Sequence, residues 1–321
     1  MSRFSSRRDH SPESRTRADA PERRVCLVAD DFGLRAGVDA AIIDLVASRR
    51  LQALGCMTGG RSWSASAPGL LTTTFEQTDL GLHLDLSECP IGRAPERLGR
   101  LIVQAYTHQL DRESVRLEIR LQLSAFEDAL GQPPDYVDGH QHVHQLPQIR
   151  DLLLDELTER YPADRRPWLR STRTAPAQRS SVASGTRNTP RSPAPEDALS
   201  QASSIAIRAK ASLIAALGSR ALERRGRQLG FRMNAALLGV YGFDADARRY
   251  LAMLSHWFAS APDAALMMCH PGRGDDSSDP IAAAREIELQ VLAGSDFPEL
   301  LARHRIRLMA MSDILRPMPS I

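Results

Sequence analysis

The stretch "VCLVADDFGL" (residues 25–34) holds five apolar residues and then two adjacent aspartates, Asp30 and Asp31. An apolar run of this length predicts a buried β-strand, here over residues 25–29. Behind it, apolar residues recur at helical spacing over 38–46, which predicts an amphipathic helix. A buried strand that leads into a helix is the repeating unit of proteins whose parallel sheets are covered by helices.

The same alternation of strand and helix continues along most of the chain. The length of 321 residues allows one α/β barrel or two smaller domains. The alternation predicts an α/β fold with parallel strands covered by helices. Further strands are predicted at 51–57, 79–86, 135–140, 264–272 and 306–313, and further helices at 113–130, 146–160, 205–229 and 279–294.

The predicted strands share a property at their ends. They close on the tripeptides ADD, HLD, DGH, CHP and MSD, so that apolar strands finish in carboxylates and imidazoles. In a barrel of parallel strands, the C-terminal strand ends converge on one face, where active sites are assembled. We therefore expect this face to carry the chemistry.

Two segments interrupt the pattern. Residues 1–23 are rich in Ser and Arg without periodicity, which predicts a disordered basic tail before a single domain over 24–321. Residues 172–204, rich in Ser, Pro, Thr and Arg, predict a flexible surface insertion. This insertion lies in a basic segment, 165–232, with thirteen arginines and one lysine against three acidic residues. The segment is compatible with peripheral contact with an anionic membrane, although a solvated insertion is the simpler explanation.

The composition indicates in which cellular compartment the protein works and which kinds of partner it has. The four cysteines form no C-x-x-C pair, which argues against a disulfide framework or a zinc ribbon and favours a reducing compartment. The N-terminal residues lack the apolar region of a secretory signal, and no apolar stretch is long enough to span a membrane. We therefore expect a soluble, cytoplasmic protein without a nucleic-acid partner. A homodimer is compatible with the sequence.

The densest cluster of metal-binding residue types is "YVDGHQHVHQLPQ" (residues 136–148). It places Asp138, His140, His142 and His144 at alternate positions, and in an extended segment their side chains project to one side. Imidazole is a common ligand of zinc and other divalent ions. A chance cluster is the alternative. The density favours a metal site, in which not every histidine needs to bind the ion.

Other candidates stand at the ends of the predicted strands. Asp30 and Asp31 could divide the work of general base and metal ligand, or Asp31 or Asp39 could cap the following helix. His83 could be a metal ligand oriented by Asp85, or a structural histidine. His270 follows a buried strand and could act as a general acid, or bond a loop carbonyl instead.

Four motifs together resemble the YdjC-like carbohydrate deacetylases in order and spacing. They are "LVADDFGL" (27–34), "GLHLDL" (81–86), "VDGHQHVHQLP" (137–147) and "HPG" (270–272). The likeness extends over about residues 25–315, and the family includes chitooligosaccharide deacetylases and members linked to hopanoid lipid biosynthesis. The resemblance implies a distorted TIM-like (β/α) barrel that removes an N-acetyl group from an amino sugar, in an oligosaccharide or a glycolipid.

The resemblance also implies roles for the candidate residues. A divalent metal ion, Mg²⁺ or Zn²⁺, would be held by Asp31, His83 and His140. Asp30 would be the general base and His270 the general acid. The residues expected to bind substrate or shape its pocket are His142, His144 and Asp138.

Two alternatives differ in class from a deacetylase. One is another metal-dependent amidohydrolase, or a phosphohydrolase, because one barrel fold hosts many reactions. An amidohydrolase typically brings a pair of histidines on its first strand, where this chain has aspartates instead. The other is an inactive barrel that binds lipid or protein through the basic segment. The chain has no G-x-S-x-G, P-loop or G-x-G-x-x-G motif, which argues against serine hydrolases, NTPases and dinucleotide-binding proteins.

Overall fold

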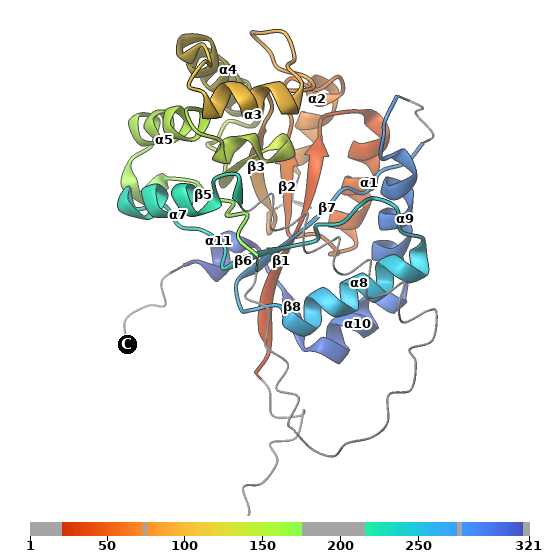
Figure 1. The fold of residues 1–321 in the computed structure, drawn as a ribbon. Coiled ribbons are helices and arrows are strands. Elements are labelled where there is room, and N and C mark those ends of the chain that lie inside the picture. Colours follow the sequence, from red (N-terminus) through yellow and green to blue (C-terminus); the bar gives the residue numbers. More distant parts are fainter. Residues whose placement is uncertain (1–20, 73–75, 175–215, 275–277, 317–321) are drawn as a thin grey trace, which may run out of the picture.

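The fold is a curled parallel sheet covered by helices (Figure 1), seen in a computed structural model that describes residues 21–72, 76–174, 216–274 and 278–316. Residues 1–20 of the predicted tail and 175–204 of the predicted insertion lie outside the described residues.

Every named strand pairs with its neighbours in parallel, which confirms the predicted α/β class. The sheet runs in the order β5-β4-β3-β2-β1-β7-β6, and β8 pairs with β1. The strands are β1 (Arg23–Phe32), β2 (Ala53–Cys56), β3 (Asp79–Leu84), β4 (Tyr136–Gly139), β5 (Trp168–Leu169), β6 (Ala236–Leu238), β7 (Ala265–Cys269) and β8 (Ile306–Leu308).

The sheet curls until its two edges meet. Isolated parallel bridges join Leu169 to Met233 and Thr174 to Leu237, so the segments around β5 and β6 lie side by side. Thr172, at the start of the predicted insertion, is fully buried, and the chain therefore still follows the barrel wall there. The resulting shape is the distorted barrel that the family resemblance implies.

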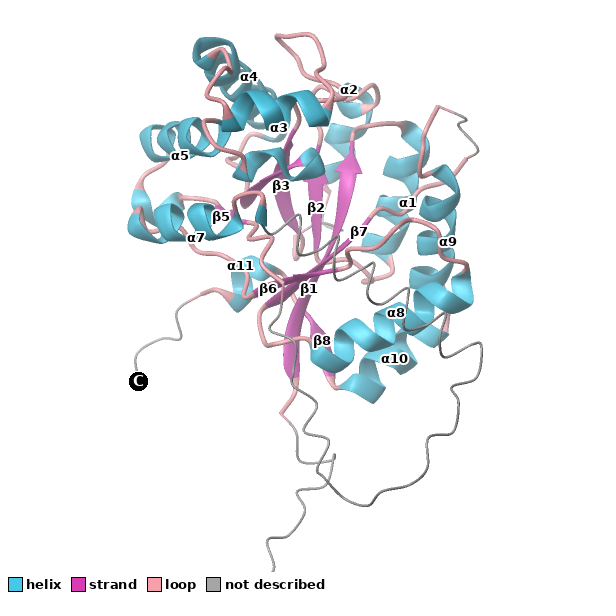
Figure 2. Cartoon of the chain, viewed as in Figure 1, coloured by secondary structure: helices cyan, strands magenta, loops and turns pink. Residues whose placement is uncertain are grey.

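Helices cover the outer face of this sheet (Figure 2). Alternate residues of β1 serve the two faces, as the period of a strand requires. Leu27 and Ala29 pack in the large cluster that includes the helices, whereas Cys26 and Val28 belong to a smaller cluster on the concave side. The helices are α1 (Ala36–Ala47), α2 (Trp63–Ser66), α3 (Leu98–Tyr106), α4 (Arg112–Leu130), α5 (Ile149–Arg160), α7 (Ser219–Gln228), α8 (Ala247–Ser260), α9 (Ala282–Ala293), α10 (Asp296–His304) and α11 (Met311–Ile314), with 3₁₀ turns η2 (Ala67–Leu71), η4 (His140–Gln145) and η5 (Ala163–Arg165).

Two predictions about strand ends are wrong. The cluster 138–144 is not extended, because β4 stops at Gly139 and η4 follows, with left-handed backbone at Gln141 and His142. The tripeptide MSD (311–313) does not reach the chemical face either. Strand β8 pairs only with the first three residues of β1, so it ends near the N-terminal ends of the strands, away from the site. There Ser312 donates hydrogen bonds to Asp79, the first residue of β3.

No helix in the described ranges is long and apolar enough to cross a membrane.

Candidate active site

The two aspartates of the first strand turn into the site through a break in regular strand geometry. The pairing of β1 with β2 shifts register between Ala29 and Phe32, and Asp31 lies there with φ at +72°. Adjacent strand residues normally face opposite sides, whereas a bulge can turn both toward one side. Both carboxylates are buried, and α1 has no side-chain cap, so Asp31 is not a helix cap.

Asp30 is held as a carboxylate by an arginine. The Arg170 guanidinium donates two hydrogen bonds to it, at 2.7 and 2.6 Å, and both residues are buried. Burial by itself raises the pKa of Asp30, but the charge and hydrogen bonds of Arg170, together with the neighbouring His83 and His270, outweigh burial, and the net pKa falls below the ordinary value. His270 lies on its other side, with Nε2 3.8 Å from Asp30 Oδ2. The arrangement keeps Asp30 ionised and beside an imidazole.

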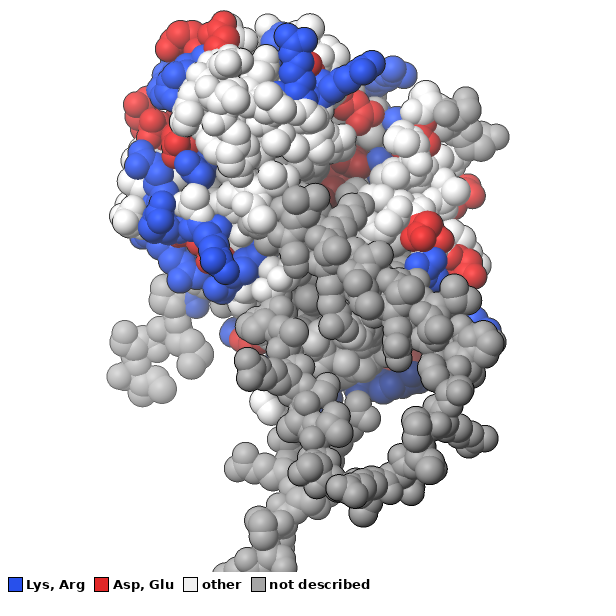
Figure 3. Space-filling view, viewed as in Figure 1, with Lys and Arg blue, Asp and Glu red and all other residues white. Residues whose placement is uncertain are grey.

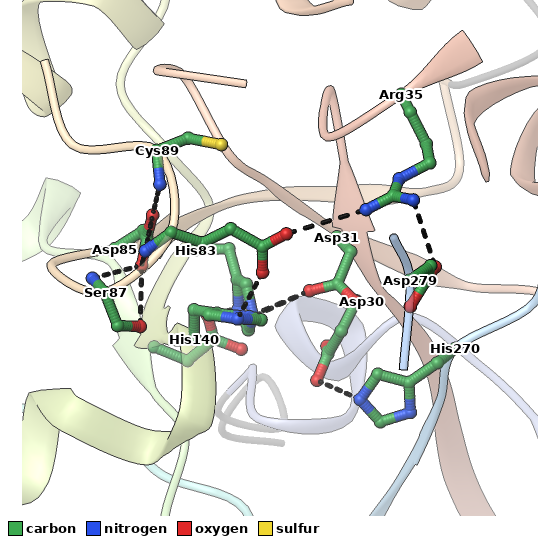
Figure 4. Close-up of polar contacts among 12 residues, drawn as sticks. Asp30, Asp31, Arg35, His83, Asp85, Ser87, Cys89, His140, His270 and Asp279 are labelled. Carbon is green, nitrogen blue, oxygen red and sulfur yellow. Dashed lines mark hydrogen bonds and ion pairs between the residues drawn. The ribbon is translucent and has the colours of Figure 1, made fainter. Parts of the chain in front are cut away.

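Asp31 faces the two histidines expected to bind metal (Figure 4). Its Oδ1 lies 3.0 Å from His140 Nδ1 and 3.5 Å from His83 Nε2. Its Oδ2 accepts a hydrogen bond of 2.7 Å from Arg285. Burial raises the pKa of Asp31, but Arg285 and His140 reverse this and hold it well below the ordinary value.

His83 is oriented by Asp138 rather than by Asp85. Its Nδ1 lies 2.6 Å from Asp138 Oδ1, which leaves Nε2 facing Asp31. Asp85 instead accepts hydrogen bonds from the backbone N–H groups of Ser87, Glu88 and Cys89. Burial disfavours a charged His83 ring, but Asp138 and Asp30 outweigh burial and raise its pKa to about 10. Carboxylates that favour an imidazolium here would equally favour a metal cation.

The other two histidines of the cluster are placed differently. His144 is fully buried, and its Nε2 lies 3.0 Å from the backbone oxygen of Arg170, to which it can donate. Burial lowers the pKa of His144 to about 4 and also lowers that of His142, so both rings are neutral near pH 7. Their rings meet edge to face, with centroids 6.5 Å apart.

His270 is fixed at the end of β7 through its backbone. Its N–H donates a 2.6 Å hydrogen bond to Glu288 Oε2 on α9, and its ring meets Phe243 edge-on, with centroids 5.1 Å apart. Burial lowers the pKa of His270 to about 4, against the opposing effect of Asp31 and Asp30. The ring is therefore neutral near pH 7.

One group of donors suits a divalent cation. Asp31, His83 and His140 each offer a ligand atom, and these atoms lie within 4.8 Å of one another. One carboxylate with two imidazoles is a common ligand set for zinc and other transition metals. A second group, Asp30, His83 and Asp138, is equally compact, but its two carboxylates already hold Arg170. The first group is the better fit.

The sequence matches a known protein family. The sequence pattern of the family described as "YdjC-like protein" matches residues 24–303.

The chain belongs to the YdjC-like family.

Curated relatives of this YdjC-like protein are named for one activity. It is 30% identical over 151 residues to a human protein named carbohydrate deacetylase, covering 43% of this chain and 46% of that one. It is 30% identical over 141 residues to a protein of Serratia marcescens named chitooligosaccharide deacetylase, covering 41% and 54%. The matched part thus spans about half the length of these relatives.

A solved structure supports the fold. The YdjC-like chain superposes on a protein of Enterococcus faecalis V583, titled a putative cellobiose-phosphate cleavage protein, with a TM-score of 0.60. The superposition covers 92% of this chain and 99% of that one at 16% sequence identity.

Several residues that shape the YdjC-like site were not predicted from the sequence. Arg170 follows β5, a strand of two residues that is too short for its pattern to be recognised. Arg285 and Glu288 lie on α9, where a helical pattern does not reveal which polar side chains turn inward. Glu88 lies in the loop after β3, where its closeness to His140 depends on the path of the loop.

Proposed function

We propose that this YdjC-like protein is a metal-dependent hydrolase that removes an N-acetyl group from an amino sugar in an oligosaccharide or glycolipid. The observation that carries the proposal is the buried group Asp31, His83 and His140, with the ionised Asp30 beside it. Membership of the family and the deacetylase names of two relatives support the same reaction class. In Figure 3 acidic side chains lie inside a recess on the face shown.

Asp31, His83 and His140 would hold the metal ion. When bound, such an ion polarises the acyl carbonyl of the substrate and makes a water molecule more acidic. Two imidazole ligands favour Zn²⁺ over Mg²⁺, which prefers oxygen ligands. Arg285 would keep Asp31 ionised and aimed at the two imidazoles through the bond to its other oxygen.

Asp30 would accept a proton from the attacking water. Its carboxylate is already ionised, and Arg170 fixes it bidentately, so it need not reorient during the reaction. The same arginine lowers its basicity, and the proton therefore needs an onward acceptor. His270, 3.8 Å away and neutral near pH 7, is placed to receive it.

His270 would then act as the general acid. Its proton goes to the nitrogen of the amino sugar as the amide C–N bond breaks, while the oxygen of water joins the acyl carbon. The products are acetate and a free amino sugar. The hydrogen bond from the His270 N–H to Glu288 would hold the ring at the site during both transfers.

The residues expected to bind substrate would differ in their roles. Asp138 and His144 are fully buried and bonded to protein groups, which favours supporting roles behind the site over direct contact with a sugar. His142 is only partly buried, and it is the member of the cluster that we propose lines the substrate pocket.

Acetate release tests the proposal. We would assay N-acetylglucosamine oligomers and N-acetylated glycolipids, with and without a chelator, using wild type and His140→Ala. Release that requires both the metal and His140 is expected. No acetate release from any substrate, with a stoichiometric divalent ion still bound, would overturn the proposed deacetylase reaction and favour another metal hydrolase. No acetate release and no bound metal would overturn the metal site.

Peripheral contact with an anionic membrane is a separate proposal for the basic segment. Helix α7 exposes Arg220, Arg224 and Arg227, although Arg227 faces Glu223 at 3.9 Å. Sedimentation with phosphatidylserine vesicles at low and high salt would test it, because attraction between exposed charges weakens as salt increases.

A further inference from the structure

We propose that Glu88 is a positioning residue for His140, so that each histidine of the metal group has its own carboxylate. The inference rests on the proposed function, because it assigns Glu88 a role toward the same metal ion. Glu88 lies outside the four motifs that carry the family resemblance, in the loop that directly follows "GLHLDL". Its role was not predicted from the sequence.

The contacts of His140 carry the inference. One ring nitrogen, Nδ1, lies 3.0 Å from Asp31 Oδ1, and the other, Nε2, lies 3.2 Å from Glu88 Oε2. His140 thus stands between a proposed metal ligand and a carboxylate. A metal-bound histidine usually donates its second N–H to a carboxylate, a carbonyl or water, which fixes the tautomer and the orientation of the ring. His83 already has this arrangement through Asp138.

The loop that carries Glu88 is built to hold it in place. The Asp85 carboxylate accepts hydrogen bonds from the backbone N–H groups of Glu88 and of its two neighbours, Ser87 and Cys89. Gly59 lies against this loop, and a side chain there would collide with the backbone oxygen of Cys89. Farther along, Glu118 on α4 accepts the N–H groups of the next loop residues at 2.7 Å. Glu88 is therefore delivered to His140 by an anchored backbone.

A second contact anchors the side chain itself. Arg35 lies 3.6 Å from Glu88 Oε1, and the same guanidinium lies 3.5 Å from Asp279 Oδ2 (Figure 4). Asp279 in turn accepts a 2.7 Å hydrogen bond from Arg285. Because Arg285 also binds Asp31, the contacts close into a ring of alternating charges that begins and ends at His140.

Glu88 is also the accessible member of the site. Its side chain is 38% exposed, whereas that of Asp138 is fully buried. Its contact with His140 is an ion pair without the geometry of a hydrogen bond, and His140 Nε2 has no hydrogen-bond partner among the described residues. Replacing Glu88 should therefore loosen the ring of His140 without unfolding the protein.

The experiment measures metal affinity as well as activity. The full chain is stripped with a chelator and titrated with Zn²⁺ against a chromophoric competitor, as wild type, Glu88→Ala and Glu88→Gln. Glu96→Gln is the matched control, since Glu96 lies in the same loop and pairs with Arg100 instead. The visible spectrum of the Co²⁺-loaded protein reports the geometry of the ligands, and thermal unfolding of the stripped proteins reports the fold.

We expect Glu88→Ala to bind Zn²⁺ about 10-fold more weakly, at the lower end of the usual effect of such partners. Glu88→Gln, which keeps an acceptor oxygen, should lose less, and Glu96→Gln should match wild type. The Co²⁺ spectrum should change in Glu88→Ala alone. Zn²⁺ affinity of Glu88→Ala within twofold of wild type, while His140→Ala loses the ion, would overturn this inference and leave the proposed function standing. A wild type that binds no divalent ion would overturn both.

Discussion

Two histidines of the site are held by similar contacts, one on the buried side of the site and the other on its exposed rim. On the buried side, His83 is bonded to Asp138, which also meets Arg170 at 2.6 Å, and all three are at most 2% exposed. On the rim, His140 meets the half-exposed Glu88, which meets Arg35 at 3.6 Å. On both sides a histidine contacts a carboxylate, and that carboxylate contacts an arginine.

The two sides should differ in how much each contributes to the stability of the fold. A buried charge that loses its partner is neither hydrated nor paired, so breaking the Arg170 side should destabilise the fold strongly. A charge near the surface is screened by water and loses little when its partner is removed. We infer that the buried side fixes the frame of the site and that the rim tunes it.

The largest effect is expected from removing the buried cation. Arg170→Met leaves the carboxylates of Asp30 and Asp138 buried without it, and the free energy of unfolding should fall by about 3–5 kcal/mol. The matched change on the rim, Arg35→Met, should cost about 1 kcal/mol or less. Urea unfolding followed by circular dichroism measures both. Equal losses would contradict the contrast between the two sides.

The next effect is a dependence of stability on pH. The folded pKa of His144 is about 4, below the ordinary value of 6.5, because burial disfavours its charged form. The unfolded chain therefore binds more protons between these values, and the contribution to stability, up to about 3 kcal/mol, is present above pH 6.5 and lost as the pH falls toward 4. His144→Gln keeps a donor for the Arg170 carbonyl and should flatten this loss. Parallel curves of urea midpoint against pH for the two proteins would refute the assignment.

A smaller effect is expected on metal affinity. Asp138→Asn keeps the shape of the side chain but removes the charge that orients His83, so Zn²⁺ affinity should fall by roughly 10- to 100-fold. Glu88→Gln should fall by less, since water screens the rim. Competition titrations of the two variants rank them. A greater loss for Glu88→Gln would show that the rim, not the buried side, sets the geometry.

The smallest effect concerns stability on the rim. Glu88→Ala should change the free energy of unfolding of the metal-free protein by no more than about 1 kcal/mol. Urea unfolding of the stripped protein checks this. A loss comparable to that of Arg170→Met would mean that Glu88 acts as part of the frame.

The sequence predicted the parallel strands and most of the residues that meet in the site. Apolar runs that end in polar residues mark strand ends, and strand ends converge in a parallel fold, which is why Asp31 and His83 were found. The extended path predicted after Gly139 was wrong, because nothing in alternating histidines signals a 3₁₀ turn. Arg170 and Glu88 were missed because a two-residue strand and an irregular loop leave no periodic pattern.

The function alternatives differ in what the metal group does. An inactive barrel would leave the group without a reaction, and another hydrolase would use it on a different bond. Acetate release is what separates the deacetylase from both, because one arrangement of ligands serves several hydrolytic reactions.

The most direct test measures bound metal and acetate release in the same samples. Wild type and His83→Gln are stripped, dialysed against Zn²⁺ and assayed on N-acetylglucosamine oligomers. The account predicts about one ion per chain and acetate release for wild type, and the loss of both in His83→Gln. Acetate release that persists in the stripped wild type, or in His83→Gln without bound ion, would contradict a metal-dependent deacetylase at this site.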